Sequence, residues 1–200
     1  MEVRTIAVIG AGTLGRGIAR LAALGGYRTI LEDLLPNALR RAESELRTHL
    51  DLAGGLGRIS PDAANRAFSD LEFAGSVEGA AREADLVIEA VPEEMESKIE
   101  MFTLLDKICR PGTILASNLF ALSISEIASV TYRASNCLGM HFTDSVDREK
   151  RLEIIRGLET DDDTLATAVE VGRRMGMDVV MIEEALAQVL VPGCGGVGTK

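Results

Sequence analysis

Three glycines near the start of the sequence have the spacing that lets a backbone approach a phosphate group. They are Gly10, Gly12 and Gly15 in the run AVIGAGTLGRGIA, between an apolar segment and a helix-like pattern. The first glycine permits a tight turn, the second allows close approach to a pyrophosphate, and the third lets the helix pack against the strand. The N-terminus of the helix stabilises the negative charge. The alternative is a glycine-rich turn that binds nothing.

An acidic side chain follows where such a ligand would carry a ribose. Asp33 ends the second apolar run, 18 residues after Gly15 and 23 after Gly10. A carboxylate there accepts hydrogen bonds from the adenosine ribose hydroxyls and repels a 2′-phosphate, which favours NAD over NADP. Glu32 is the alternative, but strand alternation places its side chain on the other face. The predicted cofactor-binding residues of this region are Gly10, Gly12, Thr13, Leu14, Gly15 and Asp33.

Alternating strands and helices must position these residues. Apolar runs typical of strands occupy 4–10, 27–33, 70–75, 85–92, 113–118, 136–142, 151–157 and 177–182. Helical patterns occupy 13–24, 36–52, 60–68, 76–84, 93–109, 123–130 and 161–176. Strands that alternate with helices in this way predict βαβ units, and therefore an α/β fold with a doubly wound, mostly parallel sheet.

Composition limits the class of protein. The 200 residues are 46% hydrophobic and 26% charged, with a formal net charge of −10. We expect one large domain over residues 1–185, followed by a glycine-rich tail over 186–200 that is poorly ordered. The acidic balance argues against nucleic-acid binding, which needs clustered Lys and Arg. No run approaches the ~20 apolar residues of a membrane span.

The cysteines bear on location and on metals. Cys109, Cys137 and Cys194 have neither CxxC nor another metal-type spacing. We therefore expect free thiols, no metal site and a cytoplasmic protein without a signal peptide.

Several sequence segments after the glycine loop give further information about the class of protein. DLVIEAVPEEMESKIEMFTLLD, ILASN, SISEIA and GMHF follow GAGTLG in this order. Together they resemble the NAD-binding domain of the 3-hydroxyacyl-CoA dehydrogenases, from about Val3 to Val180. The resemblance implies a Rossmann-like domain that binds NAD. It also implies an oxidoreductase of fatty acid metabolism that acts on the 3-hydroxyl of an acyl thioester, carried by CoA or by a carrier protein.

The resemblance also implies roles for five further residues. His141 matches the catalytic histidine and Glu153 its glutamate partner: the imidazole takes the hydroxyl proton, and the carboxylate stabilises the imidazolium and fixes its tautomer. Glu93 and Lys98 match residues near the ribose and nicotinamide of the cofactor, and Asn118 matches an asparagine at the cofactor. The alternatives are a structural histidine, a surface pair on a helix and a turn-forming asparagine.

The sequence departs from this family at the expected site. SNLFA places Phe120 and Ala121 where the family has serines, and a phenyl ring cannot donate a hydrogen bond to the reacting oxygen of the substrate. Losing such a donor typically costs about 10²–10³ in rate. Asp144 replaces an asparagine and Ser145 a proline. We expect the chain to lack the helical C-terminal domain of the family, and a homo-oligomer or a partner subunit to complete the site.

Two functions of different class follow. The first is an NAD-dependent oxidoreductase that acts on a 3-hydroxyacyl thioester, with His141 as general base. The second is a single-domain NAD(H)-binding module that has lost turnover, as Phe120 and Asp144 suggest. A truncated fragment with a vestigial role is a third reading.

Overall fold

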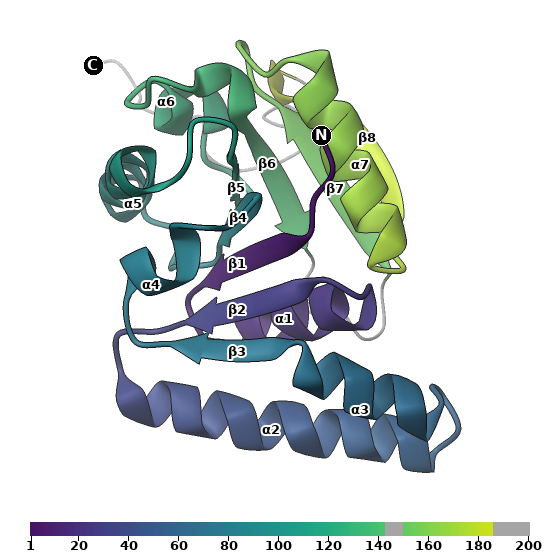
Figure 1. The fold of residues 1–200 in the computed structure, drawn as a ribbon. Helices are drawn as coiled ribbons and strands as arrows, with labels where there is room; N and C mark the ends of the chain where they lie inside the picture. Colours follow the sequence, from purple (N-terminus) through teal and green to yellow (C-terminus); the bar gives the residue numbers. More distant parts are fainter. Residues whose placement is uncertain (143–149, 186–200) are drawn as a thin grey trace, which may run out of the picture.

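The computed structural model describes residues 1–142 and 150–185, and eight strands of this part form one sheet (Figure 1). The strands are β1 (Thr5–Ile9), β2 (Arg28–Glu32), β3 (Leu71–Ala74), β4 (Leu86–Glu89), β5 (Ile114–Ser117), β6 (Cys137–Phe142), β7 (Arg151–Arg156) and β8 (Asp178–Glu183). The helices are α1 (Thr13–Leu24), α2 (Pro36–Gly55), α3 (Pro61–Ser69), α4 (Val77–Ala81), α5 (Met95–Ile108), α6 (Ile124–Ala128) and α7 (Asp162–Arg174), with a 3-10 turn η1 (Ala134–Asn136).

The sheet has the order β3-β2-β1-β4-β5-β6-β7-β8. Strands β1 to β6 pair in parallel, β7 runs antiparallel to β6, and β8 is parallel to β7. The strand order reverses between β1 and β4, and crevices at such points bind ligands at the carboxyl ends of the strands. The predicted doubly wound, mostly parallel α/β fold is therefore confirmed.

Two apolar cores cover the two faces of the sheet. Alternation along the strands separates them: on β4, Leu86 and Ile88 belong to one core and Val87 to the other. The first core packs α1, α2, α3 and α7 against the sheet, and the second packs α4, α5 and α6. Helices on both faces bury the central strand β1 completely, and its sequence TIAVI is accordingly almost wholly apolar.

Local signals place most helix ends. Gly26, with φ of +77°, follows the end of α1, and the Ser60 side chain accepts a hydrogen bond from the backbone N–H of Ala63 at the start of α3. Helix α2 continues to Gly55 instead of ending at 52, whereas α4 and α6 are each shorter than predicted. The turn η1 was not predicted, because three residues give no periodicity to detect.

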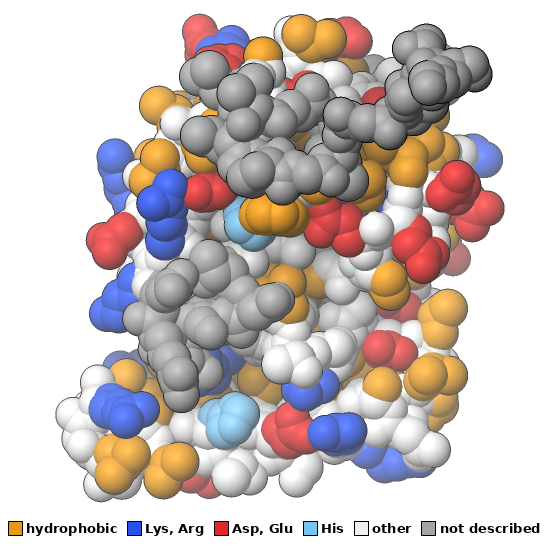
Figure 2. Space-filling view, turned by 180° about the vertical axis from the view of Figure 1, so that it is seen from behind, with side chains coloured by type: hydrophobic (Ala, Val, Ile, Leu, Met, Phe, Trp, Pro, Cys, Tyr) orange, Lys and Arg blue, Asp and Glu red, His pale blue; other side chains and the backbone are white. Residues whose placement is uncertain are grey.

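The surface matches the acidic composition. Figure 2 shows Lys and Arg side chains separated by acidic, hydrophobic and other side chains on the face that it presents. His49 is exposed on α2. In the described part of the chain, no helix is long and apolar enough to cross a membrane. The predicted tail over 186–200 lies outside the described residues.

Candidate active site

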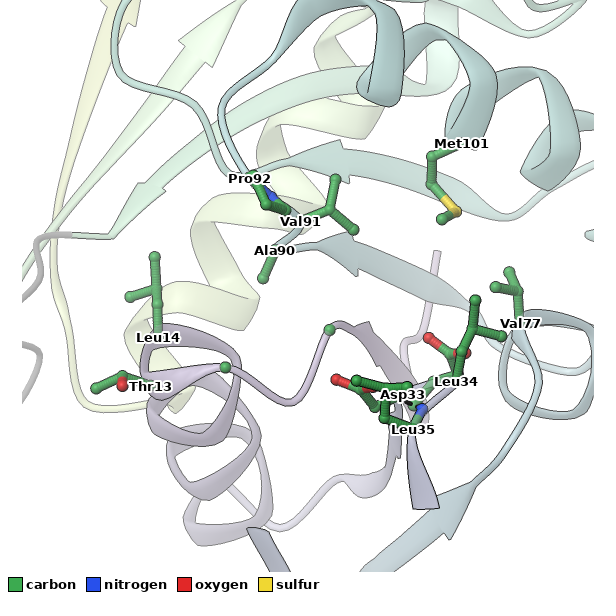
Figure 3. A pocket seen from close by; sticks show the side chains of 13 residues that line it. Thr13, Leu14, Asp33, Leu34, Leu35, Val77, Ala90, Val91, Pro92 and Met101 are labelled. Carbon is green, nitrogen blue, oxygen red and sulfur yellow. Dashed lines mark hydrogen bonds between the residues drawn. The ribbon is translucent and has the colours of Figure 1, made fainter. Parts of the chain in front are cut away.

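A cleft opens at the point where the strand order reverses. Its volume is about 630 Å³, and it lies between the loop after β1, the segment after β2 and the loop after β4 (Figure 3). Its lining residues are Gly10, Gly12, Thr13, Leu14, Glu32, Asp33, Leu34, Leu35, Val77, Ala90, Val91, Pro92 and Met101. The cleft therefore collects the glycine loop and the acidic end of β2, segments that the sequence analysis had joined only by motif.

The space available for a Cβ atom differs among the three glycines of the loop. Gly10 has φ of +104°, and a Cβ there would lie 2.9 Å from the carbonyl oxygen of Ala90. A Cβ on Gly15 would lie 1.8 Å from the carbonyl oxygen of Gly10, so that helix α1 could not approach the loop. At Gly12 a Cβ would meet nothing within 4 Å, so protein packing does not require glycine there. The space beside Gly12 belongs to the cleft.

Helix α1 directs its N-terminus to this space. Gly12 caps the helix without a side chain, and the first N–H groups of any helix have no acceptor within it. An anion beside these groups satisfies them and interacts favourably with the helix dipole. The loop therefore fits a pyrophosphate.

Asp33 lies at the mouth of the cleft directly after β2. Its Oδ2 accepts the backbone N–H of Ala11 at 3.1 Å, and its Oδ1 accepts the N–H of Leu35 at 2.9 Å. The carboxylate therefore also anchors the glycine loop to the end of β2. Each oxygen keeps a further lone pair, which suits a ribose hydroxyl.

Glu32 also lines the cleft, although strand alternation places its side chain on the other face of β2 from that of Asp33. The cleft extends over both sides of the sheet edge, since Leu14 packs on one core and Val77 on the other. A side chain at the last residue of β2 therefore reaches it from either face. Glu32 is only 2% exposed, and burial raises the pKa of its carboxyl to about 7, with a smaller contribution from the charge of Asp33.

Lys98 lies in the interior, so the alternative of a surface pair is wrong. Its ammonium group donates to both carboxylate oxygens of Glu89, at 2.8 and 2.9 Å, and to the carbonyl oxygen of Asn118 at 2.8 Å. Neither Lys98 nor Glu89 has any exposed side-chain area. In this arrangement Lys98 positions the end of β5, and its direct contact with a cofactor stays a prediction.

Glu89 joins this ion pair to the cleft. It accepts the backbone N–H of Val91 at 2.7 Å and the hydroxyl of Ser117 at 2.6 Å. Burial raises the pKa of Glu89, although Lys98, Ser117 and Val91 act in the opposite direction. The buried cluster thus fixes the loops that follow β4 and β5 relative to each other.

Glu93 and Asn118 accept hydrogen bonds from backbone N–H groups near the cleft. Glu93 Oε1 accepts the backbone N–H groups of Phe120 at 2.8 Å and Ala121 at 2.7 Å, so it orders the SNLFA segment. The Asn118 side chain accepts the N–H of Phe142 at 3.0 Å. Glu93, Lys98 and Asn118 do not line the cleft, but they connect its walls to β6.

His141 and Glu153 meet because β6 and β7 are antiparallel neighbours. The register pairs the two residues directly, and directly opposed residues present their side chains on the same face of a sheet. His141 Nδ1 lies 3.0 Å from Glu153 Oε2. Arg151 lies 2.7 Å from the other oxygen, Glu153 Oε1. Although burial alone would raise it, His141 and Arg151 together hold the pKa of Glu153 below its usual value.

Phe120 covers part of the His141 imidazole. The two ring centroids lie 5.1 Å apart with an interplanar angle of 56°, and Phe120 is 53% exposed. The residue where the family resemblance implies a serine is therefore next to the histidine, but it offers a ring instead of a hydroxyl. Asp144 and Ser145, the other noted departures, fall outside the described residues.

Several residues of the site were missed in the sequence analysis. Arg151 could have been found from its place two residues before Glu153, since alternate residues of a strand share a face. Glu89 and Ser117 gave no local signal, because a carboxylate and a hydroxyl inside apolar strands reveal nothing about their partners.

The remaining groups that could do chemistry are the cysteine thiols and possible metal ligands. Cys109 and Cys137 are free and buried, and burial raises the pKa of each thiol to about 11. Cys194 falls outside the described residues. Over 1–142 and 150–185, no group of three or more His, Cys, Asp or Glu side chains could hold a metal ion.

Comparison with known proteins gives the same assignment as the motifs. A "Probable 3-hydroxybutyryl-CoA dehydrogenase" of Bacillus subtilis is 38% identical over 184 residues, which are 92% of this chain and 64% of that protein. A "3-hydroxybutyryl-CoA dehydrogenase" of Bradyrhizobium diazoefficiens is 31% identical over 182 residues, covering 91% of this chain and 62% of the relative. This chain therefore spans a little less than two thirds of the length of these relatives.

A solved structure supports the fold. The 3-hydroxybutyryl-CoA dehydrogenase of Escherichia coli K12 superposes with a TM-score of 0.88 at 31% identity, over 92% of this chain and 39% of that one. The family described as "3-hydroxyacyl-CoA dehydrogenase, NAD binding domain" matches residues 5–185. The predicted resemblance is thereby confirmed: the chain belongs to the family of 3-hydroxyacyl-CoA dehydrogenase NAD-binding domains.

Proposed function

We propose that this chain binds NAD in the cleft and takes part in the oxidation of the 3-hydroxyl of an acyl thioester, or in the reverse reduction. The family is that of an NAD-binding domain, and the glycine loop, the N-terminus of α1 and Asp33 fit this cofactor. The observation that carries the reaction is the pair formed by His141 and Glu153, at 3.0 Å. The thioester carrier is CoA or a carrier protein.

His141 serves as the general base. With Nδ1 directed at a carboxylate, the imidazole donates its Nδ1–H to Glu153 and keeps the Nε2 lone pair for the substrate hydroxyl proton. NAD, when bound, supplies the two-electron acceptor. As Nε2 takes the proton, the charge of Glu153 stabilises the imidazolium. Arg151 keeps Glu153 ionised, so the carboxylate orients His141 and does not take the proton itself.

The remaining predicted residues bind the cofactor or position the loops of the site. Asp33 binds the adenosine ribose, while Thr13 and Leu14 present the first turn of α1 to the pyrophosphate. Glu93 orders the loop that carries Phe120, and Asn118 ties the end of β5 to β6 beside His141. Lys98 fixes the position of Asn118 by donating a hydrogen bond to the backbone carbonyl oxygen of Asn118.

One observation favours a second function, an NAD(H)-binding module without turnover. The Phe120 ring lies beside the His141 imidazole and offers no hydrogen-bond donor to a reacting oxygen. In this reading the cleft is retained for sensing NAD(H) or for a role as a subunit.

Calorimetric titration with NAD and NADH, followed by NADH absorbance after adding 3-hydroxybutyryl-CoA, tests the proposal. We expect binding and turnover in the natural chain. His141→Asn should keep the NAD affinity and lose about 10²–10⁴ in turnover. His49→Asn, at the exposed histidine on α2, is the matched control and should change neither.

The outcomes separate the two functions. NAD binding without turnover would support the binding module. Absence of binding by the folded chain would contradict both. Equal loss in the two histidine variants would show that His141 has no special role.

A further inference from the structure

Glu32 carries a polar atom that the fold does not use. Its Oε1 is buried and has no hydrogen-bond partner among the described residues. The side chain is 2% exposed, at the last position of β2. Buried oxygens without partners are rare in native proteins, because removing a polar group from water without replacing its hydrogen bond is unfavourable. An oxygen of this kind at the wall of a ligand cleft indicates that a ligand supplies the missing donor.

The position of Glu32 in the cleft is well defined. Its backbone carbonyl accepts the N–H of Gly10 at 2.9 Å, which holds it against the glycine loop. The lining residues Val77, Val91 and Met101 pack with Ile30 of β2 in one core, and their apolar side chains donate no hydrogen bonds. Asp33 is the only other titratable residue that lines the cleft within the described part, and it is an acceptor as well.

The two carboxylates differ in what they already bind. Both oxygens of Asp33 accept backbone N–H groups, those of Ala11 and Leu35. Asp33 thus lies at the glycine loop, where the ribose follows the pyrophosphate. Glu32 lies among apolar side chains, whose surfaces suit the faces of a planar base. A base in that space presents its exocyclic amino group as a donor.

We propose that Glu32 is an adenine-binding residue, whose Oε1 accepts a hydrogen bond from the 6-amino group of the dinucleotide. This inference rests on the proposed binding of NAD in the cleft. It assigns a second, separate task to the acidic end of β2: Asp33 recognises the ribose and Glu32 the base.

The test compares NAD with the analogue whose base is purine, with hydrogen in place of the 6-amino group. Both ligands are titrated into the natural chain, Glu32→Met and Glu32→Gln. The natural chain should prefer NAD by about fivefold, as one hydrogen bond allows. Glu32→Met should bind the two ligands equally, through weaker binding of NAD alone. Glu32→Gln keeps an acceptor oxygen and should keep most of the preference.

Two controls separate recognition from structure. Glu72→Gln removes an exposed carboxylate on the neighbouring strand β3, paired with Arg28, and should leave both affinities unchanged. The unfolding midpoint of Glu32→Met should equal or exceed that of the natural chain, since an apolar side chain leaves no buried oxygen unpaired.

Three outcomes would overturn the inference. Equal affinity of the natural chain for both ligands would exclude recognition of the amino group. An equal loss for both ligands in Glu32→Met would indicate a structural role only. If Glu32→Met instead lost a preference for NAD over 2′-deoxyadenosine NAD and kept the preference for NAD over the purine analogue, the donor to Glu32 would be a ribose hydroxyl. If the natural chain bound neither ligand, the proposed binding of NAD itself would fail.

Discussion

Phe120 and His141 show how a single side chain changes what the geometry of a site can do. The ring of Phe120 contacts the imidazole at a centroid distance of 5.1 Å and leaves half of its own surface in water. It cannot donate a hydrogen bond to a substrate oxygen, which the proposed reaction would require beside the proposed base His141.

Phe120→Ser should therefore raise turnover of 3-hydroxybutyryl-CoA. A restored hydroxyl donor is worth about 10²–10³ in rate where such donors have been removed. Tyr132→Ser, at a fully exposed aromatic residue, is the control and should leave the rate unchanged. The measurement is NADH formation at saturating NAD. A stable Phe120→Ser variant that binds NAD and shows no gain would mean that the barrier lies elsewhere.

Glu32 should make stability depend on pH. Burial raises the pKa of its carboxyl to about 7 in the folded chain, so the unfolded chain loses this proton at lower pH than the folded chain. The free energy of unfolding should fall as pH rises from about 4.5 to about 7, by about 1–3 kcal/mol from this group. Urea unfolding of the natural chain and Glu32→Gln at pH 5, 6, 7 and 8 measures it. Parallel pH profiles of the two proteins would contradict the assignment.

At the scale of elements, the buried pair of Lys98 and Glu89 joins a helix to the ends of neighbouring strands. It links helix α5 to the ends of β4 and β5, and through Asn118 to β6. Two opposite charges without exposed area are costly to separate, because the remaining one has no solvent to compensate it. The pair therefore makes the loops around the cleft dependent on each other.

Lys98→Met should lower the free energy of unfolding by about 3–5 kcal/mol, since it leaves Glu89 buried and unpaired. The double variant Glu89→Gln with Lys98→Met should recover part of this loss. Lys107→Met, at an exposed position of the same helix, serves as the control. Urea unfolding of all four proteins gives the comparison. A Lys98→Met variant as stable as Lys107→Met would rule out the pair as a stabilising element.

The elements differ in how far the sequence predicts them. The unit of β1, glycine loop and α1 is predictable because all its signals are local: an apolar run, three spaced glycines and a helical period. Asp33 was predictable from its distance to Gly15. The partner of Lys98 was not, because Glu89 lies on a separate strand and only the packing of α5 brings them together.

Two further features of the site depend on pairing in space. The family resemblance implied that His141 and Glu153 are partners, but the antiparallel register of β6 and β7 that brings them together is not specified by strand patterns alone. The place of Glu32 depends on the shape of the cleft, which alternation along one strand cannot predict. Local chemistry was therefore readable from the sequence, whereas contacts between elements required the fold.

At the scale of the whole molecule, the cleft lies where the two halves of the sheet meet. The glycine loop belongs to the half with β1, β2 and β3, and the loop from Ala90 to Pro92 belongs to the half with β4, β5 and β6. A ligand that contacts both halves binds only when they are assembled. Binding is therefore coupled to the folding of the entire sheet.

NAD should raise the unfolding midpoint, with a stabilisation of about 2.7 kcal/mol at a concentration 100 times its Kd. NADP should raise it less, because Asp33 repels a 2′-phosphate. Asp33→Ala should reduce the NAD shift and bring the NADP shift closer to it. Asp51→Ala, at an exposed carboxylate of α2, is the control. Thermal unfolding with each cofactor measures this, and an unchanged difference between the cofactors in Asp33→Ala would contradict the role of Asp33.

The cleft and the pair of His141 and Glu153 also differ in the length of chain that must close to form them. Strands β6 and β7 follow one another, and their register unites residues 12 positions apart. The cleft needs β1 beside β4, where Ile9 pairs with Glu89, 80 positions further on. Closing a longer loop loses more entropy and delays contact formation. A refolding molecule should therefore form the contact between His141 and Glu153 before it can hold a dinucleotide.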